Sequence, residues 1–348
     1  MHNAVGRFIR TNVLKRLNTT VIGSSQSMHL VDGRYRRCLI ETLGVGAKLI
    51  AKRVTRLPTR FSIALNKSGV PQAYLNSEYG VWIDDMKNYM EQCIVGLRHD
   101  ASEITLDITF AFKALGGSTL AQCGPGDGTV NPLSFLSDLR LDIPNAKATV
   151  RHATMTFNTE YYQLNPTQPY YINWKKSFFH VAVHEAMHAV GLGSLWNGPF
   201  RIVTAFPVVV TLPTVFAYNV VGTGNPTNPI YTAPEALAAW RETMQGQAAA
   251  GGIPIENHLM TATTIMSDAG GTALSHWREN PGGSGLTGIR DHQGRDLALE
   301  INTGWSNSQQ DEETWVGKFT IAAMRDIGWD VSYMPLEIDL WRYKSVSI

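Results

Sequence analysis

The sequence predicts an α+β fold, and three observations in its first two-thirds carry that prediction. The segment 60–66, "RFSIALN", alternates polar and apolar residues as a strand does, and 77–97 then spaces its apolar residues as a helix does. Two further segments, 103–115 and 147–158, alternate with period two. Strands interleaved with helices in this order, with an apolar helix following them, are typical of an α+β protein.

Each expected element has a local justification. The helix expected over 77–97 has one apolar face, formed by Val81, Met86, Tyr89, Met90, Cys93 and Ile94. The segment "GGSTLAQCGPGDGTVNP" between the second and third strands is rich in glycine and proline, so we expect a loop there. Farther on, "APEALAAWRETMQGQAAA" predicts a short helix, and the segment 314–331 predicts a last helix that Gly328 ends.

The chain divides into three parts at the level of composition. Residues 1–58 form a basic N-terminal arm or pro-segment, and Pro58 marks its boundary. Residues 59–196 hold the expected strands and helices and form an N-terminal lobe. Residues 197–348 are interrupted by proline and glycine and form a C-terminal lobe.

The cysteine content and the absence of long apolar segments argue against a disulfide-rich scaffold and against a membrane-spanning protein, and the charge is concentrated at the N-terminus. The 348 residues carry a net charge of +1, but the first 60 hold 12 Lys and Arg against two acidic residues. Three cysteines are too few for a disulfide framework. No apolar h-region follows the basic N-terminus, so no secretory signal is recognised, and no segment approaches the roughly 18 apolar residues of a membrane span.

The segment "FHVAVHEAMHAVGLG" contains a metal-binding pattern, His184-Glu185-x-x-His188. Residues i and i+4 of a helix lie about 40° apart around its axis and about 6 Å along it, so both imidazoles can reach one ion. Glu185 then lies beside that ion without ligating it, where it can act as a general base. The plainer alternative is a core helix with two buried, hydrogen-bonded histidines.

A catalytic zinc ion needs three protein ligands and one open position, and the helix supplies only two. The downstream candidates are His276, His258, Asp268 and His292. Two other histidines are set aside. His152 lies in an expected strand, and His180 lies about 12 Å along the helix from His188, so we expect a surface or outer-sphere position for it.

With "HEAMHAVGLGSLWN", the sequence resembles the leishmanolysin-like branch of the metzincin zinc endopeptidases. Compact metzincins would have the third ligand at Ser194, which cannot serve, whereas this branch supplies it from tens of residues downstream in a His-Trp context. The segment "SHWREN" matches that context, so the resemblance implies His276 as the third ligand. Collinear matches extend over roughly residues 60 to 332 and leave 1–58 uncovered.

The resemblance implies an N-terminal lobe with a mixed twisted sheet and two long helices, a loop-rich C-terminal lobe, and an active-site cleft between them. His184, His188 and His276 would hold Zn²⁺, and a peptide substrate would lie along an edge strand, expected at 147–158. One departure stands out. The family has a methionine turn below the metal, and the best match here, "EINTGW", has Asn302 in place of methionine.

The function predicted from these residues is a zinc-dependent endopeptidase that hydrolyses peptide bonds with a metal-activated water and Glu185 as general base. The alternative is a structural subunit of a large assembly, such as a virus particle, that retains the fold, with its basic arm on an acidic partner surface.

Two locations fit a sequence in which no secretory signal or membrane segment is recognised. The protein could be extracellular, or it could be associated with a virus particle. Cys38, which directly follows Arg36 and Arg37, is a candidate inhibitory thiolate for the zinc; packing in a helix or strand is the alternative.

Overall fold

The structure is a computed structural model. It describes residues 60–98, 103–125, 139–142, 147–165, 167, 177–193, 196, 201–203, 209–211, 220–221, 229–256, 274–279, 286–305 and 314–333. The predicted basic arm, residues 1–58, lies outside the described residues.

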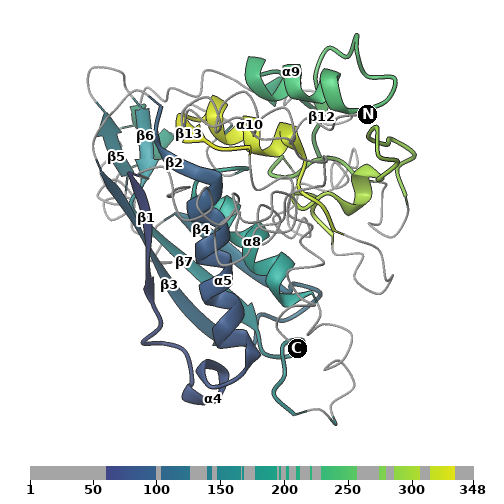
Figure 1. Cartoon of the computed structure of the whole chain (residues 1–348). Helices are drawn as coiled ribbons and strands as arrows, with labels where there is room; N and C mark the ends of the chain where they lie inside the picture. The colour runs from purple at the N-terminus through teal and green to yellow at the C-terminus, as the bar shows by residue number, and fades with distance from the viewer. Residues whose placement is uncertain are drawn as a thin grey trace, which may run out of the picture.

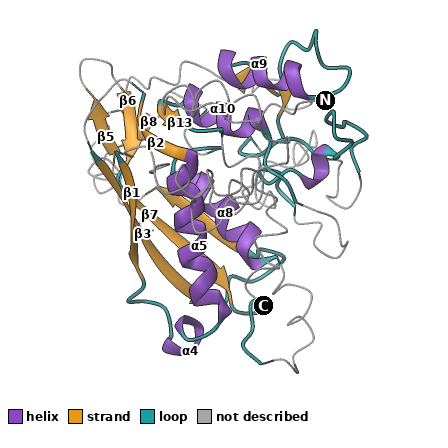
Figure 2. Cartoon of the chain, viewed as in Figure 1, coloured by secondary structure: helices purple, strands orange, loops and turns teal. Residues whose placement is uncertain are grey.

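The central element is a four-stranded sheet with the order β1-β3-β7-β4. Strands β1 (Phe61–Asn66), β3 (Ile104–Lys113) and β7 (His152–Asn158) are parallel, and β4 (Ala121–Pro125) pairs antiparallel with β7. The sheet is therefore mixed, as predicted. Figure 2 shows it as one layer, with helices forming a second layer on one of its faces.

Helices α5 (Glu78–Cys93) and α8 (Phe178–Ala189) pack against each other and against the sheet (Figure 1). The alternation in β1 and β3 places apolar side chains, among them Ile63, Leu106 and Phe110, in the buried core. Phe178 at the start of α8 packs its ring 4.4 Å from that of Phe157, measured between centroids. Burial of large aromatic side chains thus fixes α8 on the sheet.

The helix predicted over 77–97 is shorter than expected. It ends at Cys93, and the next four residues form strand β2 (Ile94–Leu97), which pairs antiparallel with β13 (Trp329–Val331). Ile94 already has extended backbone angles, with φ −112° and ψ 125°. The helical spacing of apolar residues continues past Cys93, but the backbone of the next residues forms its hydrogen bonds with the distant strand β13. This pairing overrides the local preference for a helix.

The segment 147–158 is also different from the prediction, because it forms two strands. Strand β6 (Lys147–Val150) pairs with β5 (Leu139–Asp142), and β7 begins at His152. Since β7 lies between β3 and β4, it is not an edge strand, and the expected substrate edge at 147–158 is wrong. The edge strand on that side is β4, within a segment predicted to be a loop from its glycine and proline content.

The C-terminal part contains short elements joined by irregular segments. Helices α9 (Pro234–Thr243) and α10 (Lys318–Asp326) pack against each other. The remaining bounds are α4 (Gln72–Leu75), β8 (Arg201–Val203), β9 (Val209–Thr211), β10 (Val220–Val221), β11 (Ile230–Tyr231), β12 (Ile253–Pro254) and η2 (Leu297–Leu299).

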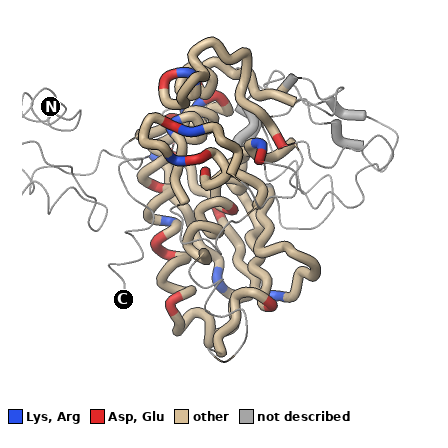
Figure 3. The backbone as a smooth tube through the Cα atoms, turned by 90° about the vertical axis from the view of Figure 1, so that its right-hand side faces the viewer, with Lys and Arg blue, Asp and Glu red and all other residues tan. Residues whose placement is uncertain are grey.

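The parts assigned to the two lobes share one hydrophobic core. Buried residues of α5 and α8 belong to the same cluster as those of α9 and α10, and Met324 of α10 is among them. The division at residue 196 therefore stays a prediction. Charged residues of both signs are interspersed along the described backbone in Figure 3. Within the described part of the chain, no helix has the length and apolar character that a bilayer crossing requires.

Candidate metal centre

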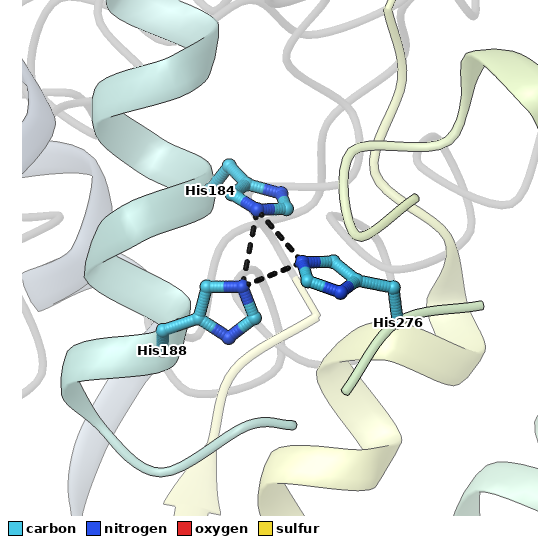
Figure 4. Close-up of side chains that lie close together, drawn as sticks. All are labelled: His184, His188 and His276. Atoms are coloured by element: carbon cyan, nitrogen blue, oxygen red, sulfur yellow. Dashed lines mark hydrogen bonds between the residues drawn. The ribbon is translucent and has the colours of Figure 1, made fainter. Parts of the chain in front are cut away.

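Three histidine side chains converge on one point from two distant parts of the chain. His184 and His188 project from one side of α8, and His276 comes from the segment 274–279 (Figure 4). The Nε2 atom of His188 lies 3.1 Å from that of His184 and 2.9 Å from that of His276, and the third separation is 3.2 Å. The predicted third candidate therefore lies beside the helix histidines.

The hydrogen bonds behind two of these rings determine which nitrogen faces the centre. Nδ1 of His184 lies 2.6 Å from the carbonyl oxygen of Ile301, and Nδ1 of His188 lies 2.7 Å from that of Leu192. A carbonyl only accepts, so each Nδ1 carries the proton and each Nε2 presents a lone pair. Two lone pairs facing each other repel unless a cation lies between them, and neutral imidazoles oriented in this way are the state that binds a metal.

The spacing of the three nitrogens fits a small tetrahedral cation. Zinc bonds imidazole nitrogen at about 2.0–2.1 Å in tetrahedral geometry, which places ligand nitrogens about 3.3–3.4 Å apart. The observed separations are shorter by a few tenths of an ångström. Burial, and then the neighbouring His188, lower the pKa of His184 to about 3, and burial also lowers the pKa of His188. Both rings are therefore neutral at pH 7.

The turn that ends α8 brings the carbonyl group of Leu192 against the ring of His188. Gly191, at φ 102°, donates its N–H to the carbonyl of His188, and Leu192 donates to the carbonyl of Met187. This pattern is a Schellman motif, which requires a residue with positive φ, here glycine. It turns the chain so that the carbonyl of Leu192 meets the ring of His188.

Gly193 allows the next close approach. A Cβ atom at this position would lie 2.2 Å from the carbonyl oxygen of Ser275 and 3.0 Å from two ring atoms of His188, and φ is +75°. The segment after α8 can therefore touch the segment that carries His276 only because residue 193 lacks a side chain.

Trp277 anchors the third histidine. Its side chain is fully buried, with its ring centroid 4.8 Å from that of Trp196 and 5.6 Å from those of Tyr231 and Phe319. Its indole N–H donates to Thr320 Oγ1 at 2.9 Å. These contacts fix the backbone that carries His276.

Glu185 is buried next to the edge strand of the sheet. Burial raises the pKa of its carboxyl group to about 8, although a hydrogen bond with the backbone of Cys123 in β4 lowers it. The thiol of Cys123 also has a pKa well above its usual value, through burial and then the charge of Glu185. The thiol is therefore protonated, and Glu185 is the group at this position that can exchange a proton near neutral pH.

The other histidines considered that lie within the described residues are not part of this cluster. His292 is exposed, with Nε2 3.2 Å from the carbonyl oxygen of Glu242, and the exposed His152 lies 3.4 Å from a carboxylate oxygen of Asp107 on the neighbouring strand. His180 is buried in α8, which excludes the surface position considered for it. His258, Asp268, Ser194 and Cys38 lie outside the described residues, so the predictions made for them stay predictions.

The segment Glu300–Thr303, which was expected to correspond to the methionine turn, passes directly beside the site. The carbonyl of Ile301 binds His184, and the carbonyl of Asn302 accepts the N–H of Trp277. Asn302 is fully buried, and within the described structure neither polar atom of its side chain has a hydrogen-bond partner. Such burial costs on the order of 1–3 kcal/mol per group unless water satisfies it.

Several groups that shape the site were not predicted. The carbonyls of Leu192 and Ile301 and the N–H of Cys123 belong to the backbone, which sequence patterns do not distinguish. Glu300 is a side chain that the sequence could have pointed to, because it lies two residues before Asn302 in the segment "EINTGW". Comparison with known proteins gave no matching family model and no matching curated protein.

Proposed function

We propose that this protein is a zinc-dependent endopeptidase of the metzincin type. The observation that carries the proposal is the convergence of His184, His188 and His276, with Glu185 beside them and two of the rings oriented by carbonyl groups. Three imidazoles form the ligand set of a catalytic zinc site, and in such a site a carboxyl group lies near the metal without ligating it. Zn²⁺ held there would lower the pKa of water and polarise the scissile carbonyl group.

Glu185 acts as the general base and then as the general acid. Its pKa is raised to about 8 by burial, so that its carboxyl group gains and loses a proton near neutral pH. It takes a proton from the attacking water and passes it to the amine that leaves. The backbone of Cys123 holds the carboxylate in place from the β4 side.

The substrate binds as an extended strand along β4. Asn158 donates its N–H to the carbonyl of Leu120, so alternate residues of this strand bond to β7 and those between them point outward. Cys123 is one of the outward residues, in agreement with its hydrogen bond to Glu185. A peptide added to this edge lies in a cleft between the proposed lobes, next to the three histidines.

The second candidate is a structural subunit that keeps the metal site with reduced or no hydrolysis. Asn302 favours it, because a buried polar side chain without a partner in the described structure replaces an apolar one beside the metal ligands. The basic first 60 residues would then contact an acidic partner surface in an assembly.

The test is metal analysis of the full chain combined with a casein hydrolysis assay, with and without a chelator. We expect about one equivalent of zinc, and hydrolysis that the chelator abolishes and added zinc restores. A chain that binds one equivalent but cleaves no peptide supports the structural subunit. A chain that binds no divalent metal refutes both candidates.

A further inference from the structure

Glu300 is a buried carboxylate at the centre of a hydrogen-bond network outside the metal ligands. It is 1% exposed. Its Oε2 accepts the N–H of Asn302 at 2.7 Å, and its Oε1 accepts the N–H of Gly317 at 2.8 Å and the hydroxyl of Thr320 at 2.6 Å. Both oxygens are therefore used, and the three donors come from its own turn, from the residue before α10 and from α10 itself.

Two short paths lead from this carboxylate to two of the three histidines. The first runs through the turn that Glu300 holds closed, since the carbonyl of Ile301 in that turn binds Nδ1 of His184 at 2.6 Å. The second reaches His276 through its neighbour Trp277. The N–H of Trp277 donates to the carbonyl of Asn302 at 3.0 Å, and its indole donates to Thr320, which donates to Glu300.

We propose that Glu300 is the positioning residue of the metal centre, which sets the ring of His184 and the backbone carrying His276 relative to each other. This inference rests on the proposed metal site and adds the group that determines its geometry. The two ligands come from segments 92 residues apart, and α8 fixes only one of them. The carboxylate joins both to α10, a helix packed in the core.

The network needs a hydrogen-bond acceptor at both side-chain oxygen positions of residue 300. Glutamine has one acceptor oxygen and one NH₂ group. In Glu300→Gln the NH₂ group, itself a donor, would therefore lie against the N–H of either Asn302 or Gly317, and that hydrogen bond would be lost. At 1% exposure, water has little access to relieve that conflict. The turn must then shift, and the carbonyl bound to His184 shifts with it.

The experiment measures Co²⁺ and Zn²⁺ binding to the metal-free full chain by competition with a chromophoric chelator, together with the visible spectrum of the Co²⁺ form. We expect Glu300→Gln to weaken binding roughly 10- to 100-fold and to change the Co²⁺ bands, as changes behind metal ligands do. Thr320→Val, which removes one hydroxyl and keeps Glu300, should weaken binding less. Thr320→Ser, which keeps the hydroxyl, should restore the wild-type values.

Asp291→Asn is the matched control. Asp291 is equally buried and accepts bonds from Gln293 and from Arg295, within its own loop. This variant should lose thermal stability without a change in metal affinity or Co²⁺ spectrum. Equal affinity and spectra for wild type and Glu300→Gln would overturn the positioning role, as would loss of metal binding in Asp291→Asn to the same degree.

The outcomes separate this inference from the proposed function. If the wild-type chain binds no divalent metal, the metal centre itself fails. If the wild type binds metal and the Glu300 variant binds it equally well, only the positioning role fails. Where Glu300→Gln does not fold, the comparison of Thr320→Val with Thr320→Ser decides, because equal binding by these two refutes the network.

Discussion

At the residue scale, His276 lies beside the two helix histidines although 87 residues separate it from His188 along the chain. Closing a long loop costs only about 0.6 kcal/mol for each doubling of its length, so the distance along the chain is not prohibitive. The precision comes from the anchors on either side of the imidazole, namely the buried indole of Trp277 and the close approach of Gly193 to Ser275.

Replacing His276 should abolish tight zinc binding. We expect His276→Ala to weaken affinity by more than about 100-fold, because it removes a ligand where changes behind a ligand cost 10- to 100-fold. His292→Ala is the matched control, since His292 is exposed and its Nε2 lies 3.2 Å from the carbonyl oxygen of Glu242, away from the three histidines. Competition titration of both metal-free proteins tests this. Comparable losses in the two variants would refute the assignment of His276.

Glu185 should affect turnover and leave the metal bound. Glu185→Gln keeps the three imidazoles and removes the basic group, so we expect near-normal zinc content with hydrolysis roughly 10²- to 10⁴-fold slower. Glu242→Gln, at a carboxylate that is 64% exposed, should hydrolyse casein normally. Near-normal turnover by Glu185→Gln would exclude the proton transfer assigned to it.

At the scale of elements, the orientation of His188 depends on how helix α8 ends. The Schellman turn at Gly191 directs the chain under His188, and the indole N–H of Trp329 in β13 binds the carbonyl of Val190. The helix end is thus held by its own glycine and by a strand from the far end of the described chain. A small change in this turn should move the carbonyl that orients His188.

Alanine substitution of two glycines with similar φ angles separates the cost of backbone strain from the cost of a steric contact. Gly193→Ala and Gly246→Ala both place a Cβ at φ near +70°, which costs about 1 kcal/mol. Only residue 193 also meets a carbonyl oxygen and the ring of His188, so its total cost should be on the order of 3 kcal/mol, with weaker zinc binding. Urea unfolding and zinc titration of both variants test this. Unchanged zinc affinity in Gly193→Ala would show that the His276 segment adapts to the added methyl group.

At the scale of the whole molecule, the C-terminal helices and the N-terminal sheet are parts of one core. Strand β13 pairs with β2, and Arg98 after β2 lies 2.7 Å from the carboxylate of Glu235 in α9. Asp326 of α10 accepts the first N–H groups of α9, so the two helices are joined at one end. The three histidines therefore lie within a single packed structure, and global stability and metal binding should be linked.

The stability of the metal-free chain should fall as pH rises from 6.5 to 8. Burial raises the pKa of Glu300 to about 7, although its three donors and Arg295 lower it. A folded-state pKa above the unfolded value gives stability that is complete at low pH and is lost as pH rises through 7. His184 and His188, whose pKa values burial lowers, are neutral in the folded chain but still partly protonated in the unfolded chain near the usual pKa of 6.5, so they oppose this loss below about pH 7.5, equally in wild type and in a Glu300 variant.

The measurement is the melting temperature against pH in the presence of a chelator. One such group contributes at most about 1.4 kcal/mol per pH unit, and Glu300→Gln should show a shallower decline than wild type. Glu185, whose pKa is also raised, acts in the same direction in both proteins. Equal slopes would indicate that Glu300 is already ionised in the folded chain at pH 6.5.

The sequence by itself determined the local elements and the chemistry they present. The period-two segments at 60–66 and 103–115 form β1 and β3, and helical spacing with His-Glu-x-x-His forms α8 with both imidazoles on one side. These features follow from side-chain periodicity, which is a property of neighbouring residues. The family resemblance located His276, and the structure places it beside the other two histidines.

Tertiary structure alone decided where the strands pair and which groups hold the ligands. The resemblance implied a substrate edge at 147–158, whereas pairing puts β7 inside the sheet and β4 at its edge. Strand β2, which was expected to be part of a helix, pairs with β13. The network of Glu300 joins three segments that no local pattern connects. The physical reason is that strand pairing and burial of a carboxylate depend on the hydrogen-bond partners that distant segments supply, and these exist only after the chain has folded.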